Sequence, residues 1–351
     1  HEKMNIYAYL SILESFLKLV IAVGISFISL DRLLWYAILI LILSISIRLV
    51  YQLYCRRNFE ESRFNFIFNK EVFKQMISFF SWDLYGNMCL VFRLQGTNIL
   101  LNMFFGPIVN ASVAIVGQFQ GGLMSLSSNF TLAAKPQMIQ SYAGKDYERV
   151  FLLLKQGTKL SFYLVMIFSI PLSFNSKFIL ELWLNEVPPY ADQFLQLSLI
   201  ASVLSVSFSL FNPIIHATGK VFLNSFVTGT IYLLSLLIIY VLFKYGFSPV
   251  TPYYVIFFIV LLVGVTNLFI VQKYLPEFNA MSFIKTVLIK MYFIYILLIG
   301  LGFLQSIYLP IHPILSMFIL FILSCGIVLI FGLTKKERYR TSNILKEKLS
   351  Q

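Results

Sequence analysis

The segment 81–107, SWDLYGNMCLVFRLQGTNILLNMFFGP, is long and apolar enough to cross a membrane, yet it is rich in side chains that could do chemistry. A helix rises about 1.5 Å per residue, which puts Arg93 roughly 18 Å beyond residue 81, near the middle of a bilayer. A charge there costs about 3 kcal/mol unless it faces water, protein or a partner. Arg93 is therefore predicted either to form an ion pair inside a helix bundle or to bind an anion in a water-filled pathway.

The other polar residues of this segment follow helical spacing. One face of the predicted helix should carry Asp83, Asn87, Gln95, Asn98 and Asn102, and Arg93 should lie on another side. The next apolar segment, 110–134, has a matching character, with Gln118 among glycines and serines at three- and four-residue steps. Such faces either pack two helices tightly through amide hydrogen bonds or line an aqueous path.

Two further segments carry charge within apolar runs. Glu14 and Lys18 form an i, i+4 pair that either neutralises itself or leaves Lys18 facing the same path as Arg93. Arg48 either extends its guanidinium to the interface or joins that path. Glu14 and Asp83 are candidates for ion coupling or charge pairing. The basic residues expected to extend their amines to the interface are Lys155, Lys159 and Lys290.

Composition indicates a polytopic membrane protein, because 59% of the 351 residues are hydrophobic and only 12% are charged. About 20 apolar residues cross the hydrocarbon core as a helix, and hydrocarbon requires every backbone amide to be satisfied within its own segment. The expected fold is all-α with ten transmembrane helices. The predicted spans are 7–29, 34–54, 81–105, 110–134, 152–175, 192–215, 222–243, 252–272, 286–306 and 312–333.

Basic residues predict the orientation of these spans. If both ends of the chain are cytoplasmic, 18 basic residues fall in inside segments and three in outside loops. Such a bias is the pattern of an inner-membrane protein with positive loops inside. The net charge of +12 therefore reflects orientation, and nucleic-acid binding is not expected.

No catalytic or metal-binding pattern accompanies the polar spans. The three cysteines lack CxxC spacing, the three histidines are far apart, and neither a Walker loop nor a GxSxG or HExxH motif is present. We expect no cofactor, no metal and no ATP hydrolysis by this chain, and hence a function other than that of an enzyme.

The order of several motifs resembles one family. After QGTNILLNMFFGP come a Gln- and Gly-rich helix, AAKPQ, LELWLNEVPP and NPIIHATGK. This order resembles the lipopolysaccharide O-antigen flippases, the polysaccharide-transporter branch of the multidrug/oligosaccharidyl-lipid/polysaccharide exporter superfamily. The resemblance covers nearly the whole chain.

The resemblance implies a helical bundle of two six-helix lobes plus two extra helices, of which about four amino-terminal helices would be missing here. The implied domains are the last two helices of the amino-terminal lobe at 1–54 and a cytoplasmic linker with an amphipathic helix at 55–80. A six-helix carboxy-terminal lobe would follow at 81–272, two additional helices at 273–333, and a basic cytoplasmic tail at 334–351.

The resemblance also implies an activity, the translocation of an undecaprenyl-diphosphate-linked oligosaccharide across the bacterial inner membrane by alternating access. Membrane lipids and other polysaccharide-assembly membrane proteins would be its partners. Arg93, with Lys18 and Arg48, would supply positive charge for the diphosphate. The amides expected to bind sugar hydroxyls or line the path are Gln95, Asn98, Asn102 and Gln118.

Two alternatives remain at this point. A cation-coupled multidrug exporter of the same superfamily should favour acidic residues within its spans, whereas basic residues outnumber acidic ones here. A membrane glycosyltransferase or O-antigen polymerase should carry a large outer loop with catalytic residues, and the predicted loops are short.

Overall fold

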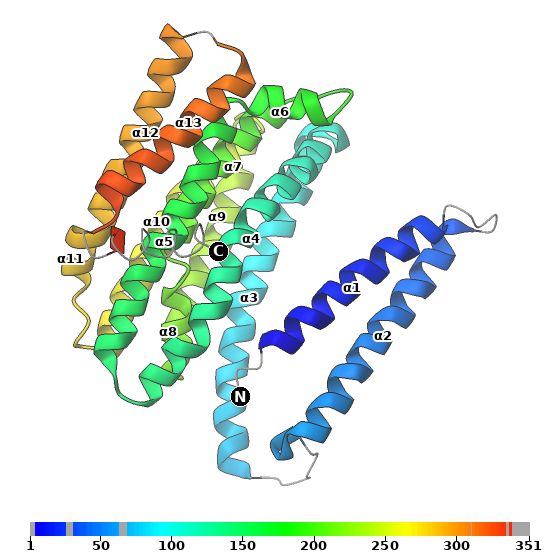
Figure 1. Ribbon diagram of the computed structural model, residues 1–351, viewed down its shortest axis with the longest axis vertical. Coiled ribbons are helices and arrows are strands. Elements are labelled where there is room, and N and C mark those ends of the chain that lie inside the picture. Colours follow the sequence, from blue (N-terminus) through cyan, green and yellow to red (C-terminus); the bar gives the residue numbers. More distant parts are fainter. Residues whose placement is uncertain (1–3, 26–30, 63–68, 310, 335–336, 339–351) are drawn as a thin grey trace, which may run out of the picture. The chain divides into compact units, whose positions relative to one another are not determined.

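The computed structural model describes all residues except 1–3, 26–30, 63–68, 310, 335–336 and 339–351. Its regular structure is helical throughout the described residues. The chain divides into two compact units, residues 1–73 and 74–351. In the first unit, α1 (Met4–Ile25) and α2 (Arg32–Asn58) form a helical hairpin (Figure 1). Asp31 caps α2 by accepting hydrogen bonds from the backbone N–H groups of Leu33 and Leu34.

The second unit is a bundle built around α5. Its long helices begin with α3 (Lys70–Phe105), which crosses the boundary between the units, and continue with α4 (Pro107–Ala143) and α5 (Tyr147–Phe174). α5 is the most enclosed of the candidate spans, because it packs against α4, α7, α12 and α13. The remaining elements are α6 (Ser176–Trp183), α7 (Ala191–Val206), α8 (Phe211–Ala217), α9 (Phe222–Lys244), α10 (Thr251–Tyr274), α11 (Ala280–Phe283), α12 (Ile289–Tyr308) and α13 (Pro313–Ile327).

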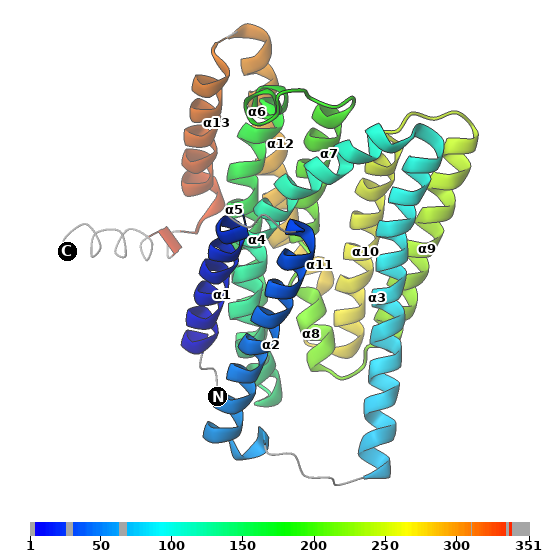
Figure 2. The same ribbon diagram turned by 90° about the vertical axis from the view of Figure 1, so that its right-hand side faces the viewer.

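Figure 2 shows α3, α9 and α10 together on one side of this unit and α12 and α13 on the other. Gly229 allows α3 and α9 to approach closely, since a Cβ at this position would lie 2.9 Å from the Tyr85 ring and 3.2 Å from the Cys89 sulfur. Trp82 packs edge-on against Phe222 across the same contact, with ring centroids 4.4 Å apart. The polar end of α3 is thereby held against α9.

The candidate span formed by α7 and α8 together is broken. The two helices meet at an angle of 40°. The sequence between them, 207–210, contains two serines, and Pro213 follows within the first turn of α8. Proline cannot donate the hydrogen bond that would continue the helix, and serine hydroxyls compete for backbone carbonyls, so a bend here has a local cause. Phe208 at the break packs against Gly264 of α10.

The prediction of ten spans is confirmed in part. Eight helices are long and apolar enough to cross a membrane, as expected of a multi-pass membrane protein, and the bent pair α7–α8 would make nine. The predicted span 110–134 is helical, but α4 is not among these candidates. Its glycines, serines and amides lower its hydropathy, so helix formation and membrane crossing are separate questions for this segment.

Two other predicted segments lie partly outside the described residues. An amphipathic helix was expected over 64–80, leading into the next span; residues 64–68 lie outside the described residues, and 70–80 forms the first turns of α3. Most of the predicted tail 334–351 also lies outside them, and the predicted domain boundaries stay a prediction. The described part of the tail is not simply a solvated segment, because Glu337 reaches α5.

Lys159 and Glu337 form an ion pair between α5 and the tail, which we call the tail clamp. The ammonium of Lys159 donates hydrogen bonds of 3.0 and 2.8 Å to the two carboxylate oxygens of Glu337. Lys159 is only 6% exposed, so its amine is paired within the protein, and its expected extension to the interface stays a prediction. Burial favours a raised pKa for Glu337, but the hydrogen bonds from Lys159 and Thr334 outweigh it and hold the pKa below its ordinary value.

The tail clamp predicts a specific loss of stability. Glu337→Gln leaves the buried ammonium without a counter-ion, which is expected to cost about 3 kcal/mol of unfolding free energy. Thermal unfolding in detergent should show the loss, whereas Lys155→Gln, at an exposed position on the same helix, should change little. Because the pKa of Glu337 is lowered, the contribution should persist at neutral pH and disappear as the pH falls through that lowered pKa. Equal unfolding temperatures for the two variants would contradict the clamp.

A second prediction concerns the contact between the bend and α10. A Cβ at Gly264 would overlap the ring of Phe208, and an aromatic ring cannot move aside as a flexible side chain does. Gly264→Ala is therefore expected to lower the unfolding free energy by about 1–3 kcal/mol. Gly121→Ala is the matched control, because a Cβ there meets no atom within 4 Å. A destabilisation by Gly121→Ala as large as that by Gly264→Ala would show that close packing at the bend is not the cause.

Candidate functional site

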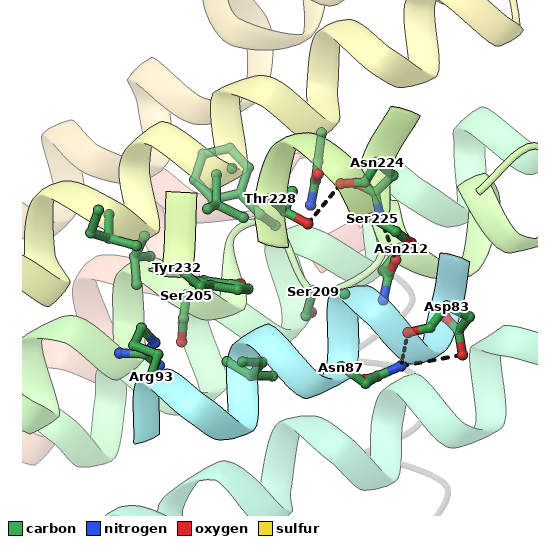
Figure 3. Close-up of a pocket in the computed structure, with 18 of the residues that line it drawn as sticks. Asp83, Asn87, Arg93, Ser205, Ser209, Asn212, Asn224, Ser225, Thr228 and Tyr232 are labelled. Carbon is green, nitrogen blue, oxygen red and sulfur yellow. Dashed lines mark hydrogen bonds between the residues drawn. The ribbon is translucent and has the colours of Figure 1, made fainter. Parts of the chain in front are cut away.

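A polar cavity of about 350 Å³ lies within the second unit, between α3, the bent pair α7–α8, α9 and α10 (Figure 3). Every helix that forms it supplies polar side chains. They come from α3 (Asp83, Asn87, Arg93), from the bent pair (Ser205, Ser209, Asn212, His216), from α9 (Asn224, Ser225, Thr228, Tyr232) and from α10 (Asn267). The break between α7 and α8 places polar residues on both sides of the bend against the cavity, which a straight apolar span would not do.

Arg93 lies on the wall of this cavity and has unused hydrogen-bonding capacity. Its guanidinium carbon lies 5.3 Å from the centroid of the Tyr232 ring, a cation–π contact. Its Nε is buried and has no hydrogen-bond partner among the described residues. No described carboxylate lies within salt-bridge distance of it, so the ion pair that was one of the two predictions for Arg93 is not found in the described part of the chain.

Asp83 lies toward the other end of the same helix face, ten residues before Arg93 and thus about 15 Å away along the axis. One of its carboxylate oxygens is 3.4 Å from Nε2 of His216. The other accepts a hydrogen bond of 3.2 Å from the amide of Asn87. One oxygen of Asp83 thus lies beside a histidine of α8 and the other accepts from an amide of its own helix. The cavity carries a guanidinium at one end and a carboxylate at the other, and the predicted charge pairing of Asp83 stays a prediction.

Three further amides of the cavity were not singled out from the sequence. Asn224 donates a hydrogen bond of 3.2 Å from its amide nitrogen to the side-chain oxygen of Asn212. Asn224 and Asn267 are 7% and 8% exposed, and the side-chain oxygen of each is buried without a partner. Asn267 interrupts the apolar run LLVGVTNLFIV, and this lone amide in an apolar span was the signal that could have found it.

The other predicted amides lie elsewhere. Gln95, Asn98 and Asn102 do not line the cavity, and neither does Gln118. Successive helical residues turn by about 100°, so the residues of α3 on the Arg93 side and those on the Gln95 side point apart. Asn98 and Gln95 contact each other at 3.5 Å, in keeping with the face that they were predicted to share. That face and the cavity face coincide only near Asp83 and Asn87.

Three of the predicted charges, Glu14, Lys18 and Arg48, belong to the first unit. Glu14 and Lys18 form the expected pair, with 2.6 Å between the carboxylate and the ammonium. Arg48 is exposed on α2. Their suggested roles at a diphosphate site stay predictions. Within the described residues, no group of three or more His, Cys, Asp or Glu side chains could hold a metal ion.

The geometry predicts charge-selective access to the cavity. In a variant in which the three cysteines are replaced by alanine, Ser205→Cys should react several-fold faster with a negatively charged methanethiosulfonate than with a positively charged one, after correction for their intrinsic reactivity. The reason is the uncompensated charge of Arg93, so adding Arg93→Gln should remove the preference. Leu101→Cys, at a position 1% exposed, should stay unlabelled. A preference that persists in Arg93→Gln would contradict the assignment.

Comparisons of the chain with protein-family models, curated proteins and solved structures gave no match. The resemblance to the flippases therefore stays a prediction from the sequence.

Proposed function

We propose that this chain is a membrane transporter that moves a polyprenyl-diphosphate-linked oligosaccharide from the cytoplasmic to the periplasmic leaflet of a bacterial inner membrane. The order of motifs in the sequence supports the proposal, and so does the polar cavity enclosed by four apolar helical segments. In this proposal both ends of the chain are cytoplasmic and the protein acts without a catalytic residue.

One observation carries the proposal: Arg93 is a cation within a membrane-spanning helix, with a buried, unused N–H and no described carboxylate nearby. Keeping an uncompensated guanidinium there is costly, and that cost is offset when an anion binds. A diphosphate suits this site because a guanidinium holds phosphate oxygens through charge-assisted hydrogen bonds. The polyprenyl chain would remain in the lipid while the cavity shields the charged group.

The rival proposal is a cation-coupled drug exporter, and Asp83 is the observation that favours it. A carboxylate within a span would attract a cationic drug or a coupling ion. One of its oxygens accepts a hydrogen bond from Asn87 and the other lies 3.4 Å from Nε2 of His216, whereas the guanidinium of Arg93 has an unused donor. The cavity thus offers more to an anion than to a cation.

The proposal is tested by complementation in a source strain whose own copy of the gene is deleted. Arg93→Ala is expected to reduce surface polysaccharide at least about tenfold, because the diphosphate loses its counter-charge, and Arg93→Lys should retain part of the activity. Gln95→Ala, an exposed polar residue two positions away but off the cavity, is the control and should support wild-type levels. Surface polysaccharide is measured at membrane protein levels matched by immunoblot.

Two outcomes would count against the proposal in different ways. If the deletion strain keeps its surface polysaccharide, the function itself is rejected. If deletion removes the polysaccharide but Arg93→Ala restores it fully, the protein is needed for export and Arg93 is not the diphosphate site.

A further inference from the structure

We infer that the amide end of the cavity, formed by Asn212, Asn224 and Asn267, binds the hydroxyl groups of the sugar that is attached directly to the phosphate held by Arg93. The inference rests on the proposed function and makes it more specific. It assigns the selection of one sugar residue to asparagines of α8, α9 and α10, instead of to the amides of α3 and α4 that the sequence pointed to.

The hydrogen bonds of these amides leave two side-chain oxygens free to accept from a ligand. The amide nitrogen of Asn224 is used by Asn212, and Thr228 donates its hydroxyl to the backbone oxygen of Asn224 at 2.7 Å. The side-chain oxygens of Asn224 and Asn267 then remain as buried acceptors without partners. A buried acceptor without a partner loses its hydration on folding, so a ligand that donates to it regains that free energy. The ligand group that fits here carries more than one O–H or N–H donor.

At the Arg93 end, the cavity offers a hydrogen-bond donor and a positive charge, so it favours an anion there. Arg93 offers an unused donor and a positive charge, while Tyr232 presents its ring face to the guanidinium. Figure 3 shows Arg93 and Tyr232 on one side of the close-up and Asn212 and Asn224 on the other. A ligand that satisfies both ends is an anion joined to a compact group of hydrogen-bond donors. A glycosyl phosphate has this arrangement, whereas free phosphate or a neutral sugar satisfies only one end.

Size and charge agree with this ligand. A water molecule takes up about 30 Å³ in the liquid, so 350 Å³ corresponds to roughly a dozen waters, enough for one sugar ring with its phosphate but not for an oligosaccharide. Asp83 is the only carboxylate among the described residues that line the cavity; one of its oxygens accepts from Asn87 and the other lies beside His216. The amide oxygens are thus left for neutral donors.

The test measures binding to the purified protein in detergent. The probes are inorganic phosphate and three glycosyl phosphates: glucosyl, galactosyl and N-acetylglucosaminyl phosphate. The wild-type protein is expected to bind at least one glycosyl phosphate about tenfold more tightly than phosphate. Asn267→Leu, close in size but without an acceptor, should remove this gain and leave phosphate affinity unchanged, whereas Arg93→Gln should weaken all four probes. Asn98→Leu, an amide of α3 off the cavity, is the control and should match wild type.

Each contrary outcome overturns the inference while leaving the proposed function to its own test. If no glycosyl phosphate binds more tightly than phosphate, or if Asn267→Leu keeps the gain, the amides do not recognise the sugar. If Asn267→Leu instead removes a dependence of thermal stability on sodium ions, the amide oxygens bind a cation. After any of these outcomes, complementation by the Arg93 variants still decides whether the protein exports a diphosphate-linked substrate.

Discussion

The structure depends on one constraint: hydrocarbon offers no hydrogen bonds, so each polar group in a span must find a partner within the protein. The second unit meets this constraint in two ways. Isolated hydroxyls turn back onto their own helices or onto a neighbour, as Ser169 does when it donates to the carbonyl of Leu199. Three buried polar atoms without a partner among the described residues, Nε of Arg93 and the side-chain oxygens of Asn224 and Asn267, belong to residues that line one cavity, where water or a ligand can satisfy them. Others, such as the hydroxyls of Thr158 and Ser161, lie away from this cavity.

The bend between α7 and α8 makes this arrangement possible. A straight helix has one line of approach to its neighbours, whereas a bent one can follow the closely packed helices on one side and open a gap on the other. Phe208 fills the space beside Gly264 on α10, and Asn212 reaches the amide of Asn224 just beyond the bend. The residues that interrupt the helix thus make an apolar contact with α10, and the polar contact with α9 follows directly after them. Residues of the bend, Phe208 and Ser209, also line the cavity.

Sequence patterns predicted the helical class and the approximate positions of the helices, and they singled out Arg93, because hydropathy and intramembrane charge are local signals. They did not predict the asparagines of α8, α9 and α10, since each is a single amide in an otherwise apolar run and only the tertiary fold brings them together. The predicted face from Asp83 to Asn102 lines the cavity only at Asp83 and Asn87. A helical wheel shows which residues share a face, but it does not show which face a neighbouring helix covers. The ion pair of Lys159 was not predicted because its partner, Glu337, lies 178 residues away.

That separation in sequence has a consequence for biogenesis. Chains are synthesised from the amino terminus, so α5 enters the membrane long before the segment that carries Glu337 leaves the ribosome. Until then the ammonium of Lys159 lacks the counter-ion that stabilises it in the finished protein, and α5 can remain near an aqueous boundary. The tail clamp can therefore form only after every helix that packs against α5 has been synthesised, so it is among the last contacts that α5 makes.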